Sequence, residues 1–135
     1  MKQISLALFA AVVTFSFLGA QGAAAHERKM GPTVLLTTPL EGIAGKEAKV
    51  VEINVGPGWK IANHFHPGHV FVYILKGAIK IEVEGKPTRI VRAGEVLHEL
   101  PNNNMVANNI SSTKGASILV FSVGDIGKPL TVMVE

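Results

Sequence analysis

The chain has 135 residues, with 13 basic and 10 acidic side chains and a formal net charge of +3. This length corresponds to one domain or little more. The basic residues are scattered, with no run or stripe that could follow a phosphate backbone, so composition argues against a nucleic-acid partner. The absence of cysteine excludes disulfide bonds and a cysteine-linked lipid anchor.

Residues 1–25 have the pattern of a secretory signal peptide. Lys2 gives a positive start, Ile4 to Leu18 form an apolar centre, and Ala23 to Ala25 offer small residues for cleavage. The apolar run is short for a membrane span, so cleavage is favoured over a retained membrane anchor. We therefore predict an exported protein, periplasmic or secreted, with no membrane contact after cleavage. Export without disulfides suits a bacterial periplasm.

Residues 26–33 are predicted to form a flexible polar arm in front of a single domain at residues 34–135. Cleavage after Ala25 would make His26 the new N-terminus. An amine and an imidazole at that position could together bind copper, although a free tail histidine is the simpler interpretation.

From residue 33 onward the sequence indicates strands and turns, with no convincing helix. Val34 to Thr38 is rich in β-forming residues, and Ile79 to Glu84 alternates between apolar and charged side chains. Further strands are predicted at Lys49 to Val55, Val70 to Leu75, Thr88 to Val91, Glu95 to Leu100, Met105 to Asn109, Ser117 to Val123 and Pro129 to Val134. About ten short strands at regular spacing predict an all-β jelly roll or small barrel.

The stretch from Gly58 to Gly77 reads GWKIANHFHPGHVFVYILKG and contains the best candidates for a site. Because side chains alternate along a strand, His64 and His66 are expected to share a face. Neutral imidazoles in such a pair suit zinc, copper, iron and nickel. After the Pro-Gly bend, the run Val70 to Leu75 is entirely apolar, as in a strand that is buried on both sides.

This stretch resembles the first motif of the cupin superfamily. Gly58, the pair His64-x-His66 and an apolar strand that ends at Gly77 match that motif. The resemblance implies an all-β cupin jelly roll, or double-stranded β-helix barrel, in a single domain. Val70 stands where the motif normally carries a metal-binding glutamate.

A later stretch, from Gly94 to Asn109, resembles the second cupin motif. Pro101 and Asn102 stand at the expected turn, where asparagine replaces a glycine and can adopt the same left-handed backbone conformation. Met105 stands where the metal-binding histidine is expected, and Asn109 matches the trailing asparagine.

Three interpretations of the site remain open. In the first, a divalent metal such as iron, zinc, nickel or copper binds at His64 and His66. His98 would complete a zinc-type or iron-type site, whereas the soft thioether of Met105 would favour copper. In the second, the barrel is free of metal and binds a small organic ligand. In the third, the domain is chiefly a partner module.

Other residues near the motifs receive simpler interpretations. His69 follows the bend and is expected to face solvent or the barrel mouth. Alternation places Glu95 and Glu99 opposite His98, so no acid–base pair is predicted. A metal-free pocket would be lined by Val70, Phe71 or Val72 and their neighbours.

The functional prediction is an exported small cupin that binds a small molecule in its barrel. Metal-dependent chemistry of the oxygenase or isomerase kind is expected at His64 and His66, with catalytic residues unassigned. The alternative is a non-catalytic, metal-free ligand-binding or sensory module. Exposed strand edges in a domain without cysteine also predict a homodimer.

Overall fold

The computed structural model describes residues 29–135. The predicted signal peptide, its cleavage site and His26 lie outside this part of the chain. Ten strands follow one another in the described residues: β1 (Gly31–Pro39), β2 (Lys46–Val55), β3 (Lys60–Phe65), β4 (His69–Lys76), β5 (Ala78–Val83), β6 (Arg89–Arg92), β7 (Val96–Glu99), β8 (Met105–Asn109), β9 (Ala116–Asp125) and β10 (Val132–Met133). Residues 29–135 contain no helix, and hence none of the length and hydropathy needed to cross a membrane.

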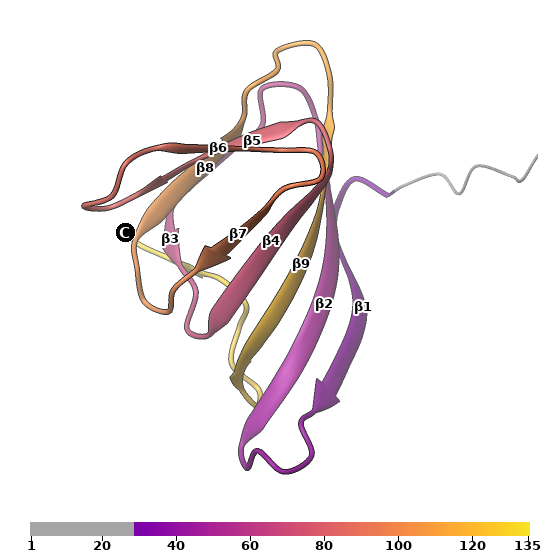
Figure 1. Cartoon of the computed structure of the whole chain (residues 1–135), viewed down its shortest axis with the longest axis vertical. Coiled ribbons are helices and arrows are strands. Elements are labelled where there is room, and N and C mark those ends of the chain that lie inside the picture. The colour runs from indigo at the N-terminus through magenta and orange to yellow at the C-terminus, as the bar shows by residue number, and fades with distance from the viewer. Residues whose placement is uncertain (1–28) are drawn as a thin grey trace, which may run out of the picture.

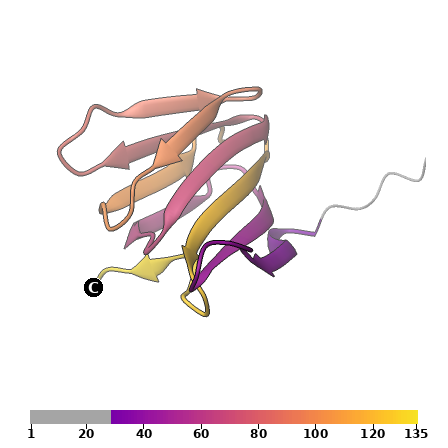
Figure 2. The ribbon, with the colours of Figure 1, turned by 60° about the horizontal axis from the view of Figure 1, so that its bottom comes forward.

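The strands form two five-stranded antiparallel sheets that lie face to face (Figures 1 and 2). One sheet has the order β1-β2-β9-β4-β7, and the other has the order β10-β3-β8-β5-β6. Consecutive strands often lie in different sheets, as in the passage from β3 to β4. The all-β prediction is therefore confirmed, and β1 includes the last three residues of the predicted N-terminal arm, 31–33.

Strand β4 shows how sheet geometry sorts an apolar sequence. Val70, Val72 and Ile74 point inward and are 1%, 7% and 0% exposed. Tyr73 and Leu75, which alternate with them along the strand, point outward and are 40% and 41% exposed. The expectation that this strand is buried on both sides is wrong, because no second layer covers its outer face within residues 29–135.

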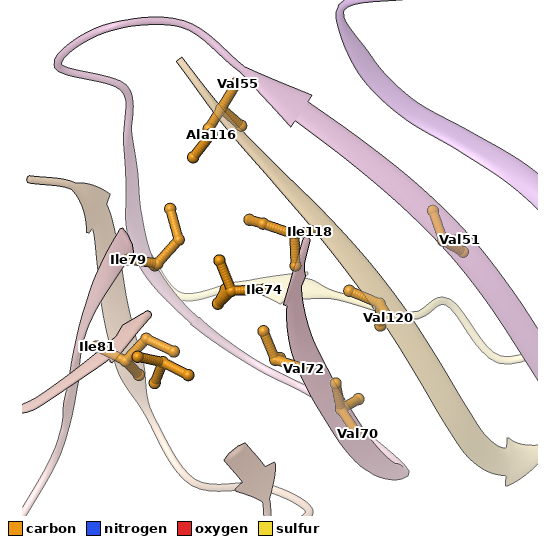
Figure 3. Packing of buried hydrophobic residues seen from close by; sticks show 11 residues of the cluster. Val51, Val55, Val70, Val72, Ile74, Ile79, Ile81, Ala116, Ile118 and Val120 are labelled. Atoms are coloured by element: carbon orange, nitrogen blue, oxygen red, sulfur yellow. The ribbon is translucent and has the colours of Figure 1, made fainter. Parts of the chain in front are cut away.

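The core lies between the two sheets, where β2, β4 and β9 face β5 and β6 (Figure 3). Each fully buried valine or isoleucine contributes about 1.5–3 kcal/mol through removal of its surface from water. The cluster comprises Val51, Val55, Val70, Val72, Ile74, Ile79, Ile81, Val91, Ala116, Ile118 and Val120. Six of these side chains also line an inner cavity between the sheets: Val70, Val72, Ile79, Ile81, Ile118 and Val120.

Three motif residues have structural roles that fix the loops. Asn102 has a φ of 59°, which confirms the left-handed turn expected there. Asn109 is buried, and its side-chain amide donates to the carbonyls of Gly56 at 2.9 Å and Lys114 at 2.8 Å. A Cβ added to Gly68 would lie 2.4 Å from the carbonyl oxygen of Val123, so only glycine fits at this bend.

Candidate functional site

The two histidines of the first motif point into the space between the sheets. His64 lies on β3 and His66 follows it directly, and they are 4% and 7% exposed. Their ring centroids are 5.1 Å apart, with the ring planes at 78°. The turn of the second motif closes over them, because the backbone N–H of Asn102 donates to the carbonyl of His66 at 2.8 Å. The two motifs therefore meet at one place.

Backbone carbonyls hold both imidazoles in one orientation. Nδ1 of His64 lies 2.8 Å from the carbonyl oxygen of Ala62, and Nδ1 of His66 lies 2.7 Å from that of Leu130. A carbonyl only accepts, so both Nδ1 atoms carry the proton and donate. Nε2 of each ring is then the atom available to the interior.

Glu99 is the residue of this site that sequence analysis missed. It lies at the end of β7, is 5% exposed, and its Oε2 is 3.2 Å from Nε2 of His66. Alternation placed it correctly on the face opposite His98, but that face is the interior of the barrel. The sequence feature that could have identified Glu99 is Leu97, because an apolar residue two positions earlier marks the inward face of β7.

The register explains why a carboxylate is found here at all. Glu99 is the cross-strand partner of Val70, the residue that occupies the usual glutamate position of the first motif. Directly opposite residues in an antiparallel pair have Cβ atoms about 4.5–5.5 Å apart. The interior thus has a carboxylate one strand away from its usual position.

The two histidines have pKa values shifted in opposite directions. Burial disfavours the charged form of His66, but the Glu99 carboxylate and the Leu130 carbonyl outweigh it and raise the pKa of His66 above its ordinary value. Burial lowers the pKa of His64, and the charge of neighbouring His66 acts in the same direction. Burial thus favours the neutral form of His64, whereas Glu99 favours the charged form of His66.

A cavity of about 70 Å³ lies against these side chains between the sheets. Its walls are apolar and include Val70 and Val72, as predicted. The exceptions are His64, His66, Glu99 and Thr131. Phe71 points to the outer face instead. The walls formed by Ile53, Trp59, Leu130 and Thr131 are shared with an apolar groove of about 530 Å³ beside β1 and β2.

The remaining predicted site residues are divided between the inside and the outside. Met105 is 2% exposed and is the cross-strand partner of His64. His98 lies on the outer face, where its ring stacks on Phe71 at 4.4 Å and its Nε2 is 3.0 Å from Nδ1 of His69. The structure thus brings His64 and Met105 together, whereas a role for His98 as third ligand in the barrel has no geometric support.

The family resemblance implies a metal, and the residues do not fit its usual four-ligand shell. Val70 and Met105 occupy two of the four positions, and His66 is already engaged by Glu99. Across residues 29–135, no three histidine or acidic side chains come together in an arrangement that could hold a metal ion. The interior side chains therefore do not form that shell.

Two facing antiparallel sheets with inward histidines at one end define a double-stranded β-helix protein with a buried polar site. The family model described as "Cupin domain" matches residues 51–121, and the chain belongs to this family. A search of curated proteins finds no match to the sequence.

Solved structures share the fold at low sequence identity. A cupin-like protein from Thermotoga maritima has a TM-score of 0.58 and 20% identity, over 76% of this chain and 74% of that one. A Klebsiella pneumoniae protein with a double-stranded β-helix domain has a TM-score of 0.58 and 22% identity, over 78% and 85% of the two chains. A DMSP lyase from Ruegeria pomeroyi has a TM-score of 0.60 and 19% identity, over 90% of this chain and 59% of the lyase. The likeness establishes the fold, which enzymes and uncharacterised cupins share.

Proposed function

We propose that this cupin binds a small, mostly apolar organic molecule between its sheets. A donor group of the ligand would form a hydrogen bond to the His64 side chain. The observation that supports this is the state of Nε2 of His64. It has no hydrogen-bond partner within residues 29–135, although His64 as a whole is buried. No fully buried side-chain nitrogen or oxygen in that part of the chain lacks a partner. Nε2 must therefore be accessible, and the cavity that His64 lines is the space it faces.

The protonation state of His64 defines the ligand group. Its Nδ1 donates to the Ala62 carbonyl and its pKa is lowered by burial, so Nε2 presents a lone pair. Such an atom accepts from a hydroxyl or an N–H group. Ligand pockets usually measure about 300–1,000 Å³, so the inner cavity of about 70 Å³ would hold the polar end of a ligand and the adjoining groove its body.

The same pair of histidines supports proton transfer. Two neighbouring titratable groups with pKa values pushed apart are an arrangement suited to one base and one acid. Neutral His64 would take a proton from the bound hydroxyl or carbon acid, and protonated His66 would return one, with Glu99 stabilising its charge. This corresponds to chemistry of the isomerase kind, and a ligand without an acidic proton would only be bound, as in a sensory module.

A pair of probes tests the binding proposal. We expect p-cresol to bind and to change the fluorescence of Trp59, the only tryptophan and a wall of the cavity. Its O-methyl ether lacks the donor, so it should bind about 5- to 150-fold more weakly, because a polar partner left unpaired costs about 1–3 kcal/mol. His64→Ala should abolish this difference, whereas the surface variant His69→Ala should keep it. If neither probe binds at millimolar concentration, or both bind equally, the proposal fails.

A divalent metal at His64 and His66 is the second candidate, and the tethering of both Nδ1 atoms favours it. A histidine that binds metal usually donates its other ring nitrogen to a carbonyl or carboxylate, as both do here. Titration calorimetry with zinc and iron(II) tests this candidate without an activity assay. Binding that is lost in His66→Ala and kept in His98→Ala would establish it, and absence of binding near neutral pH would exclude it.

A further inference from the structure

The outer face of the β4–β7 pair presents two histidines that the site between the sheets does not use. His69 opens β4 and His98 lies on β7, and both side chains are exposed. Nδ1 of His69 and Nε2 of His98 are 3.0 Å apart. These residues are 29 positions apart in the sequence, so only the pairing of the two strands brings them together.

The ring of His98 is held in place by an aromatic neighbour. Phe71 is its cross-strand partner, and the two rings stack at 4.4 Å with only 8° between their planes. His69 lies two residues before Phe71 on the same face of β4, so its ring reaches diagonally toward His98. One imidazole is therefore ordered by stacking before any ligand arrives, which reduces the entropy lost when a ligand binds.

We propose that His69 and His98 form a surface site for a divalent copper ion, separate from the barrel interior and independent of the proposed function. The two nitrogens would occupy adjacent positions around the ion. No third histidine or acidic side chain within residues 29–135 joins them in a metal-binding arrangement, so water would fill the remaining positions. An ion with open positions of this kind stays exchangeable.

The distance between the nitrogens is compatible with adjacent positions around one copper ion. With metal–nitrogen bonds of about 2.0–2.1 Å, a separation of 3.0 Å corresponds to a nitrogen–metal–nitrogen angle of about 91–97°. Square-planar and tetragonal ions, such as copper(II) and nickel(II), require an angle of about 90°. The general order of affinities also places copper(II) above nickel(II) and zinc.

Copper binding to His69 and His98 requires only that one proton moves within one imidazole ring. In the metal-free protein one ring donates to the other, so one of the two facing nitrogens carries a proton. When copper binds, that ring must present a lone pair instead. Its proton moves to the other nitrogen of the same ring, which is exposed to water, so two neutral imidazoles bind the ion with no net proton release.

The test needs a background in which other histidines do not confuse the result. The chain has five histidines, and His26 would bind copper if cleavage exposed it. The experiment therefore uses the His26→Ala protein, stripped with EDTA and titrated with copper(II) chloride at pH 7.5. Affinity is measured by calorimetry, and electron paramagnetic resonance reports the nitrogens bound to copper.

The expected result is one copper(II) site with two bound nitrogens and a spectrum of tetragonal symmetry. His69→Ala and His98→Ala should each weaken binding on the order of 100-fold, because the second imidazole then no longer acts as an intramolecular ligand. His64→Ala removes the histidine of the interior site, so a copper ion on the outer face stays bound in this variant. Glu82→Gln, at an acidic side chain of the other sheet, is the matched control and should bind as the background does. Phe71→Leu keeps both ligands but loses the stacking, so it should bind more weakly than the background and more tightly than either histidine variant.

Three outcomes would overturn the proposal. The first is absence of micromolar copper(II) binding in the background protein. The second is an affinity that stays within threefold of the background in either His69→Ala or His98→Ala. The third is loss of the copper site in His64→Ala, which would place the ion between the sheets instead.

Discussion

Replacement of Glu99 by glutamine should change both the stability of the domain and its dependence on pH. The side chains of His66 and Glu99 are only 9% and 5% exposed, with 3.2 Å between the paired atoms. Breaking a buried pair by removal of one partner typically costs about 3–5 kcal/mol. Here His66 can lose its proton, so the cost should fall to that of a hydrogen bond to a charged group, about 1.5–3 kcal/mol.

The pH dependence follows from the directions of the two pKa shifts. The raised pKa of His66 means that its stabilisation is complete below the unfolded value of about 6.5 and is lost as pH rises through the folded pKa. The lowered pKa of His64 means that the unfolded chain binds more protons below about pH 6.5, so stability falls on acidification. The combined contribution of these two histidines to stability is therefore greatest near pH 6.5.

Glu99→Gln should abolish the loss of stability at alkaline pH and leave the loss at acidic pH unchanged. Without the carboxylate, burial dominates at His66 and lowers its pKa, so the variant should no longer lose stability above about pH 6.5. The free energy of unfolding, measured by urea titration with EDTA present, should therefore differ more between wild type and variant at pH 6.5 than at pH 8.5. Glu82→Gln is the matched control, since Glu82 is 42% exposed in its pair with Lys80 and should change little. An equal difference at both pH values, or a larger one at pH 8.5, would refute the reasoning.

Three further predictions concern export, assembly and the bend between the histidines. N-terminal sequencing of the exported protein should begin at His26, and intact Met1 in a membrane fraction would contradict cleavage. We propose a homodimer through β1, which is an edge strand within residues 29–135 and where Leu35 is 54% exposed. Light scattering should show a dimer that Leu35→Lys converts to monomer, and a monomeric wild type would disprove it. Gly68→Ala should destabilise the domain by more than about 1 kcal/mol in urea titration, because its Cβ would lie 2.4 Å from the Val123 carbonyl oxygen. Gly56→Ala is the matched control, because Gly56 also lacks a positive φ and an added Cβ would make only an ordinary contact with Met30 at 3.8 Å.

Local patterns in the sequence predicted much of the fold correctly. Alternation in Ile79 to Glu84 gave the inward face of β5, and the asparagine at the second-motif turn adopts the left-handed conformation expected of it. The histidines at positions 64 and 66 share the interior face, as a period of two residues requires. Each of these features depends on the geometry of one strand or one turn, so neighbouring residues are sufficient to specify it.

The composition of the site depended on which strands pair and in what register. Glu99 meets His66 only because β7 pairs with β4 and its inward face closes the barrel, and the same pairing turns His98 outward to His69. Alternation gives the two faces of a strand but does not say which face is inside. The sequence by itself therefore determined the strands, the turns and the histidine pair. Only the tertiary structure decided which carboxylate joins that pair and which histidines lie outside, because both depend on contacts between strands that are distant along the chain.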